Sequence, residues 1–285
     1  MIGKLYPMIK KYFVLVLIML ISIGSVDLYA QSKSSDNAPR KYRKYKTKEA
    51  KFAAAKAYYD KGLYLSAAEL FEQVYPLYMG SVQGDSILFL FASSYYKNDD
   101  YLMAAFHFND FVKKYPFSPR AEEAAFMAAK AHFMNIPAYN LDQTDALLAK
   151  DGLENFLENH PGSVYNSECN AMLDTIRNQL AHKAYAAAHL YYRIGQYAAA
   201  QIAYNNLLKN YPGSVYTEKA LYDMVRNSYE YAEKSVPEKQ GERYQKAIDC
   251  HYQLEAKFPQ SAYLTETKKI AENAVKKRDL AVKEN

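Results

Sequence analysis

The residues that could carry out chemistry are few and lie far apart along the chain. His182 and His189 are seven positions apart, so they would share one face of a helix. A zinc site needs three or four ligands, and no carboxylate falls near them on that face, which argues against a metal centre. The sequence also lacks a glycine-rich phosphate loop, a paired-histidine zinc helix, a Cys-x-x-Cys pair and a nucleophile elbow. We therefore expect no catalytic residues, no metal and no cofactor.

The other titratable candidates have structural interpretations. His251 stands at an aromatic core position of the repeats described below, which predicts a packed ring. The pair Glu122 and Glu123 would begin a helix, where acidic side chains complement the helix dipole. Cys169 and Cys250 have no framework of further cysteines around them, which favours two separate packed thiols. Pairing between them stays an alternative if the chain is exported.

The amino terminus has the pattern of a secretory signal peptide over residues 1–30. Three lysines precede an apolar run over residues 13–23, and cleavage is predicted after Ala30, a small residue before a polar one. The run is eleven residues long, against the roughly 20 that span a bilayer, so a permanent membrane anchor is the less favoured alternative. No cysteine follows the run, so we expect membrane association through partners.

Residues 31–47 are predicted to be a flexible basic linker, because they contain almost no apolar residue to bury. Cations alternate with tyrosines in their second half, and a membrane-surface or nucleic-acid patch is the less favoured interpretation. The whole chain has 36 Lys and Arg against 31 Asp and Glu, a net charge of only +5. This balance gives no reason to expect nucleic acid as a partner.

From about residue 48 the chain repeats itself. Paired tyrosines are followed by a glycine such as Gly62 or Gly195, which accepts the left-handed geometry of a helix end. A small alanine such as Ala200 would let a second helix approach closely, and proline would stop that helix before a serine that caps the next one. Four closures share this pattern: Tyr115-Pro116-Phe117-Ser118, His160-Pro161-Gly162-Ser163, Tyr211-Pro212-Gly213-Ser214 and Phe258-Pro259-Gln260-Ser261. Their prolines are 45, 51 and 47 residues apart.

The pattern predicts an all-α fold made of stacked helix hairpins, because one hairpin cannot bury its own apolar face. The spacing of Gly195, Tyr197, Ala200, Tyr204 and Pro212 resembles the tetratricopeptide repeat. We therefore expect a tetratricopeptide-repeat helical solenoid of about five helix hairpins with a C-terminal capping helix.

The expected repeats group as N-terminal repeats 1–3 over residues 48–163, and as repeats 4–5 with the capping helix over residues 164–285. Extra residues at 135–140 and 235–239 are expected in turns, whereas residues 166–180 should lengthen the first helix of the fourth repeat. Residues 265–282 should form the capping helix. The five expected repeats are 48–81, 85–118, 121–163, 181–214 and 219–261.

The first helices of the repeats are expected to line a concave groove. In each tyrosine pair one ring should face the core and the next the groove, together with side chains one and two helical turns earlier. Aromatic rings with scattered cations suit a peptide that carries aromatic residues and a carboxylate. Packing of these rings against neighbouring repeats is the alternative. The candidate groove residues are Phe52, Lys56, Tyr59, Phe89, Ser93 and Tyr96 in the amino-terminal repeats, and Tyr185, His189 and Tyr192 in the fourth repeat.

The arrangement of repeats, insertions and Tyr-Pro-x-Ser closures over residues 48–261 resembles the BamD family of the outer-membrane β-barrel assembly machinery. This resemblance implies a non-catalytic protein at the periplasmic face of the outer membrane. It would bind the barrel insertase through the insertase's POTRA region and recruit unfolded outer-membrane β-barrel proteins by a carboxy-terminal aromatic signal. The amino-terminal repeats would bind substrate. The carboxy-terminal half would hold the insertase, with Tyr185, His189, Tyr192 and Arg193 as candidate contacts.

Two other classes of function fit the same repeats. One is a periplasmic scaffold for cell-wall synthesis, division or another secretion complex, and recovery of the insertase on purification would distinguish it. The other is an enzyme with a repeat-built helical fold, which should contain a compact domain outside the repeats. The sequence shows no such domain.

Overall fold

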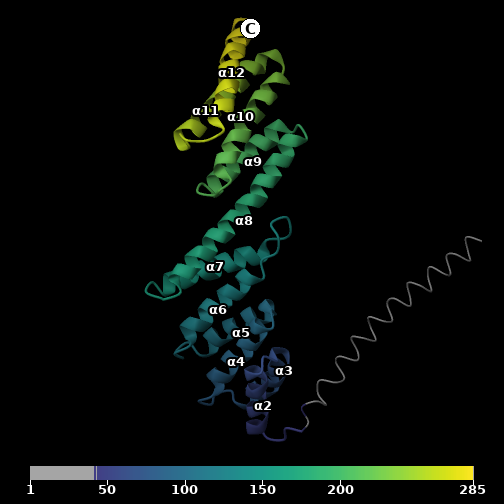
Figure 1. Ribbon diagram of the computed structural model, residues 1–285, viewed down its shortest axis with the longest axis vertical. Helices are drawn as coiled ribbons and strands as arrows, with labels where there is room; N and C mark the ends of the chain where they lie inside the picture. The colour runs from purple at the N-terminus through teal and green to yellow at the C-terminus, as the bar shows by residue number, and fades with distance from the viewer. Residues whose placement is uncertain (1–41, 43, 285) are drawn as a thin grey trace, which may run out of the picture. The chain divides into compact units, whose positions relative to one another are not determined.

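The computed structural model describes residue 42 and residues 44–284, and every regular element in this part of the chain is helical (Figure 1). The predicted all-α fold of helix hairpins is confirmed. The predicted signal peptide and most of the predicted linker lie outside the described residues. No helix within residues 44–284 is both long and apolar enough to cross a membrane.

The chain divides into two compact units, and the boundary in the sequence falls between Ala128 and Ala129, within one helix. The expected grouping of the repeats, with a division after residue 163, stays a prediction. The first unit contains α2 (Lys48–Asp60), α3 (Tyr64–Val74), the short 3₁₀ helix η2 (Tyr75–Leu77), α4 (Gly84–Lys97) and α5 (Tyr101–Lys114). Helix α6 (Ala121–Met134) contains the boundary. The second unit contains α7 (Thr144–Asn159), α8 (Asn166–Arg193), α9 (Tyr197–Asn210), α10 (Thr217–Glu233), α11 (Pro237–Lys257) and α12 (Leu264–Glu284).

The turn inside each hairpin follows the predicted glycine chemistry in two repeats. Gly62 and Gly195 have φ angles of 75° and 77°, and each lies two positions after the last residue of its helix, α2 or α8. In the second repeat Asp99 takes the same conformation with φ of 60°, although it is not glycine. The next residue, Asp100, caps α5 by accepting a hydrogen bond of 3.2 Å from the backbone N–H of Met103. An Asp pair thus replaces the glycine turn, since Asp tolerates left-handed backbone better than most residues.

The Pro-x-Ser closures form tight turns between hairpins. In each closure the serine N–H donates to the carbonyl of the residue before proline, as from Ser118 to Tyr115 at 3.0 Å. The expectation that serine caps the next helix is wrong. The Ser163 hydroxyl instead accepts from the N–H of Tyr165 at 3.1 Å, and Tyr165, which precedes α8, makes no side-chain cap. The serine therefore stabilises the turn rather than the helix end.

The two insertions have different outcomes. The first lies in the connection between α6 and α7, as expected, whereas only residues 234–236 separate α10 from α11. The expectation of a long turn there is wrong, because Pro237 opens α11 at a position that suits proline, and the extra residues extend that helix to 21 residues. The predicted long helix of the fourth repeat is confirmed as α8, with 28 residues. The predicted capping helix is confirmed as α12.

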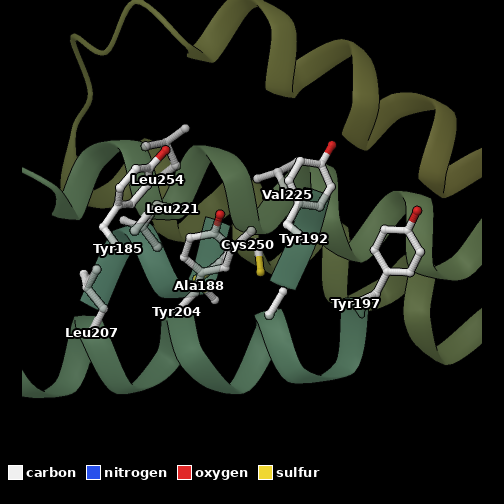
Figure 2. Close-up of a cluster of buried hydrophobic side chains, with 13 residues drawn as sticks. Tyr185, Ala188, Tyr192, Tyr197, Tyr204, Leu207, Leu221, Val225, Cys250 and Leu254 are labelled. Atoms are coloured by element: carbon white, nitrogen blue, oxygen red, sulfur yellow. The ribbon is translucent and has the colours of Figure 1, made fainter. Parts of the chain in front are cut away.

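One core cluster of the second unit joins helices α8 to α11 (Figure 2). Tyr204 and Ala200 of α9 are fully buried there against aromatic rings of α8. Cys250 of α11 belongs to the same cluster, while Cys169 is buried elsewhere, and both thiols are free. The interpretation of the cysteines as separate packed residues is therefore confirmed. His251 is also packed, as predicted, with its Nδ1 3.0 Å from the Thr267 hydroxyl.

Overpacking at Ala200 tests this hairpin. Because its side chain has no exposed surface, Ala200→Leu should lower the free energy of unfolding by roughly 1–3 kcal/mol. Ala198→Leu, two positions earlier on the exposed face of α9, should change it by less than about 0.5 kcal/mol. Urea denaturation followed by circular dichroism measures both. Equal stabilities for the two variants would contradict the helix contact at Ala200.

The end of the predicted linker packs against the first repeat. The Tyr42 side chain is buried, and its hydroxyl donates to Glu69 Oε2 at 2.6 Å and to the Ser66 carbonyl at 3.2 Å. Its ring meets that of Tyr58 edge-on, with centroids 6.2 Å apart. The expectation of a flexible linker is therefore wrong at Tyr42. Burial of a large aromatic ring is favourable, even where the residues around it are mostly polar.

Candidate functional site

In the first unit, Tyr59 and Tyr96 are the half-buried rings of the predicted groove. Tyr59 of α2 meets Tyr64 of α3 edge-on at a centroid distance of 5.5 Å. Tyr96 of α4 meets Tyr101 of α5 in the same way at 5.4 Å. The two repeats therefore place equivalent tyrosines in equivalent positions. Each ring is supported by its own hairpin and still has exposed surface.

Phe89 and Ser93 of α4 were expected to line the groove, but both side chains are buried. Both are 8% exposed, and the Phe89 ring packs edge-on against Phe108 and Phe111 of α5 at 5.4 and 5.7 Å. Phe89 is buried because the two phenylalanines, three positions apart on α5, form an aromatic pocket that covers its ring. Phe52 is half-buried, with its ring 6.0 Å from Tyr78.

The structure adds a cation to this surface that the sequence analysis missed. The Arg120 guanidinium lies 4.7 Å from the centre of the Phe89 ring, a cation–π contact. Arg120 also influences Tyr59: burial raises the pKa of the Tyr59 hydroxyl, while a hydrogen bond to Ser93 and the charge of Arg120 act in the opposite direction. Arg120 directly precedes α6 in the sequence, and this position alone does not predict a contact with α4. We define the tyrosine–arginine surface as Tyr59, Phe89, Ser93, Tyr96 and Arg120.

This surface has the chemistry to bind an aromatic group and an anion. The half-buried tyrosine rings offer faces and hydroxyls, and the exposed Arg120 offers several N–H donors in a planar fork. Lys56, one turn before Tyr59 on α2, is exposed and adds a second cation. Lys56 and Arg120 are therefore the two candidate cations for a carboxylate.

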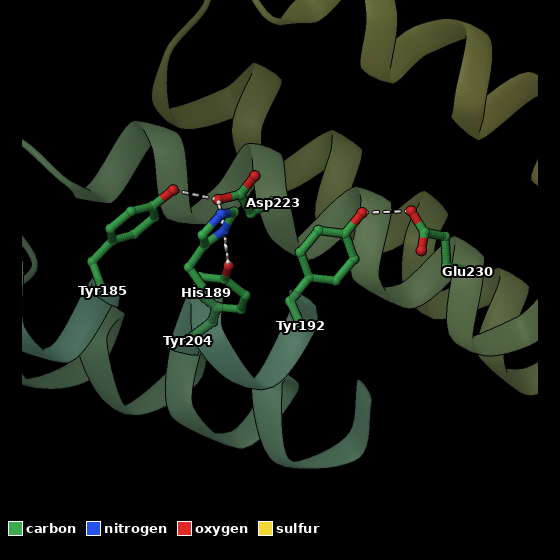
Figure 3. Close-up of polar contacts among 6 residues, drawn as sticks. All are labelled: Tyr185, His189, Tyr192, Tyr204, Asp223 and Glu230. Atoms are coloured by element: carbon green, nitrogen blue, oxygen red, sulfur yellow. Dashed lines mark hydrogen bonds and ion pairs between the residues drawn. The ribbon is translucent and has the colours of Figure 1, made fainter. Parts of the chain in front are cut away.

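In the second unit, the candidate residues of α8 face α10 rather than an open groove (Figure 3). Tyr185 and Tyr192 are only 7% and 9% exposed. The Tyr185 hydroxyl donates to Asp223 Oδ2 at 2.6 Å, and the Tyr192 hydroxyl donates to Glu230 Oε1 at 2.5 Å. The expected groove position of these two rings is wrong. The alternative of packing against the neighbouring repeat holds because α10 supplies an acceptor for each hydroxyl.

Asp223 is the centre of a buried polar cluster. It is 2% exposed, and its Oδ2 also accepts from the Tyr204 hydroxyl at 3.3 Å and lies 3.3 Å from His189 Nδ1 (Figure 3). Burial, together with the hydrogen bond and charge of Asp223, raises the pKa of Tyr185 far above its usual value. The pKa of Tyr204 is also raised, chiefly by burial and then by the charge of Asp223. These tyrosines therefore stay protonated as donors.

The α10 acceptors could have been found from spacing. Tyr185 and Tyr192 are seven residues apart on α8, and Asp223 and Glu230 are seven residues apart on α10. Matching seven-residue spacing on neighbouring helices brings the two pairs together along both helices. Between the acceptors, Arg226 lies 5.6 Å from the Tyr192 ring centre. The remaining candidate, Arg193, is exposed at the end of α8.

The histidine pair on α8 has aromatic and carboxylate neighbours rather than metal ligands. His182 stacks between Tyr139 and Tyr216, with centroids 3.6 and 4.8 Å away. His189 meets Asp223, a carboxylate from the next repeat. Among the described residues no group of three or more His, Cys, Asp or Glu is arranged to hold a metal ion.

Comparison with known proteins gives one family. The sequence profile of YfiO, described as an outer membrane lipoprotein, matches residues 44–241, more than half of the chain. No curated protein has a matching sequence. A solved structure of the assembly chaperone of RpL4 (Acl4), residues 1–338, aligns with 83% of this chain and 99% of its own at 13% identity and a TM-score of 0.27. A score this low supports no argument about function.

Proposed function

The chain belongs to the YfiO (BamD) family of outer membrane lipoproteins, and from this premise we propose that it recruits unfolded outer-membrane β-barrel proteins and binds the barrel insertase. It would do so at the periplasmic face of the outer membrane, without catalysis. The observation that carries the proposal is the tyrosine–arginine surface, where exposed ring area lies beside a fixed cation. A chain end with an aromatic residue and a carboxylate offers the matching groups.

The substrate contact is proposed for the first unit. The terminal aromatic ring would pack on Tyr59 and Tyr96, while Arg120 and Lys56 would attract the carboxylate. Phe89 and Ser93 would position the binding residues rather than touch the substrate, because Phe89 contacts the Arg120 guanidinium and Ser93 contacts the Tyr59 hydroxyl. Phe52 would extend the apolar edge of the same surface.

The insertase contact is proposed for the end of α8 in the second unit. Arg193 is exposed, and the apolar side chains around it are exposed as well, with Leu190 at 55%, Tyr191 at 43% and Ile194 at 60%. Exposed apolar side chains around an arginine have the composition of an interface centre. The buried Tyr185 and Tyr192, with the half-buried His189, would position α8 for this contact rather than touch the POTRA region.

A double substitution tests the substrate surface. Tyr59→Ala with Tyr96→Ala should weaken binding of a fluorescent peptide from the carboxy terminus of a barrel protein at least tenfold, about 1.4 kcal/mol, because both ring contacts are lost. Fluorescence anisotropy measures the affinity. Tyr252→Ala, which removes a 59% exposed ring of the second unit, is the matched control and should bind normally.

The same variants separate the two proposed contacts. Affinity purification from envelope membranes should recover the insertase with the double variant as well as with wild type. Unchanged peptide affinity in the folded double variant would refute the substrate surface. Failure of wild type to recover the insertase would favour a scaffold of another envelope complex.

A further inference from the structure

A pocket of about 360 Å³ lies between α9, α10 and α11 of the second unit, and the proposed function does not use it. Its volume falls within the usual range of small-ligand sites. Lys239, Arg243 and Lys246 of α11 line it, with Glu242 as the one acidic lining residue. Three cations against one carboxylate give the lining a net charge of +2.

The position of these cations is not explained by helix stability. Lys239 lies in the first turn of α11, where a positive charge opposes the helix dipole. Lys239 and Lys246 are exposed, and neither forms an ion pair with a described carboxylate. Their charges are therefore available to a ligand.

Arg243, by contrast, is held in place. Its guanidinium lies 3.7 Å from the centre of the Tyr231 ring and donates a hydrogen bond to the Ser235 hydroxyl. The Tyr231 ring stacks in turn on Tyr197 at 6.0 Å. A planar donor fixed in this way loses little conformational freedom when it binds a carboxylate.

Uncharged polar groups complete the lining. The buried Ser228 donates to Gln201 Oε1 at 3.0 Å, and Asn227 Nδ2 donates to the same oxygen at 3.2 Å. These two donors fix the orientation of the Gln201 amide. Its Nε2 is buried without a hydrogen-bond partner. A buried donor in this state is costly, and a carbonyl or carboxylate oxygen of a ligand would satisfy it.

We propose that this pocket binds an extended acidic segment of a partner protein with carboxylates at alternate positions. Lys239 and Arg243 are four residues apart, a separation of about 6 Å along a helix. Alternate side chains of an extended chain are separated by about 6.6–6.8 Å on one face. The cations thus form a row, which suits successive carboxylates better than a single phosphate, and the Gln201 amide suits a peptide backbone. This site is independent of the proposed function.

A labelled peptide with glutamates at alternate positions tests the site against the full chain. Lys239→Gln with Lys246→Gln should weaken its binding at least tenfold in fluorescence anisotropy at low salt. Both lysines are exposed and neither forms an ion pair with a described carboxylate, so the variant should fold normally. Lys268→Gln with Lys269→Gln, two exposed lysines of α12 outside the pocket, removes the same charge and should bind like wild type. Arg243→Lys keeps the charge, loses the planar fork and should also bind more weakly.

Three results would overturn the proposal. Equal affinities of the pocket variant and the α12 variant would show binding to general charge. Full displacement of the peptide by inorganic phosphate at constant ionic strength would show a simple anion site. Binding of anionic phospholipid vesicles that depends on Lys239 and Lys246, without binding of the peptide, would show a lipid site. The aromatic peptide of the first unit should bind the pocket variant normally, so this test can fail without affecting the proposed function.

Discussion

Asp223→Ala is expected to lower the free energy of unfolding by about 3 kcal/mol, because it leaves buried donors without their acceptor. Tyr185 and Tyr204 both direct their hydroxyls to Asp223 Oδ2, and both side chains are buried. Each buried hydroxyl without a partner costs about 1–3 kcal/mol. His189 loses its carboxylate neighbour as well.

Two further variants show whether the acceptor itself matters. Asp223→Asn keeps an oxygen of the same shape and should destabilise by clearly less than alanine, since the Tyr185 hydroxyl can donate to the amide oxygen. Asp151→Ala removes a carboxylate whose side chain is 70% exposed and should have almost no effect. Urea denaturation of the three variants beside wild type gives the comparison. If asparagine were as damaging as alanine, the charge rather than the hydrogen bonds would stabilise the cluster.

The fold could be predicted well from the sequence because each repeat contains the same local signals for the ends of its helices. Gly62 and Gly195 end the first helices as expected, and the prolines of the closures end the second helices. These signals act over a few residues, so they can be interpreted without knowing the neighbours. The failure at α11 has the same origin: Pro237 suits the start of a helix as well as a turn, and spacing alone cannot distinguish the two.

The side-chain orientations could be predicted less well, because they depend on the next repeat. Whether Tyr192 faces a groove or a neighbour is decided by Glu230, which lies 38 residues later in the chain. Phe89 is likewise covered by rings of α5, and Arg120 approaches from the start of α6. Helix periodicity assigns a side chain to a face, but the partner of that face is a property of the stack.

Because of its buried tyrosines, the folded protein should lose stability steeply as the pH rises above about 10. Burial raises the pKa of Tyr185, Tyr192 and Tyr204, and the charges of Asp223 and Glu230 raise it further. Above about pH 10 the unfolded chain releases protons that the folded chain retains, so the unfolded state is favoured. Below that pH their contribution is fully present. Each tyrosine then costs about 1.4 kcal/mol per pH unit, and the three together cost about 4 kcal/mol per unit.

Tyr204→Phe isolates one of these contributions with almost no change of shape. Its hydroxyl loss should destabilise the protein by a constant amount up to about pH 9, because Tyr204 is then protonated in both states. Above about pH 10 the variant should lose stability more slowly than wild type, by about 1.4 kcal/mol per pH unit, and the two curves should converge. Urea denaturation across this pH range measures the difference. A difference that stays constant to about pH 11 would mean that Tyr204 ionises equally easily in the folded and unfolded chains, and that the core of the fourth repeat admits water at its hydroxyl.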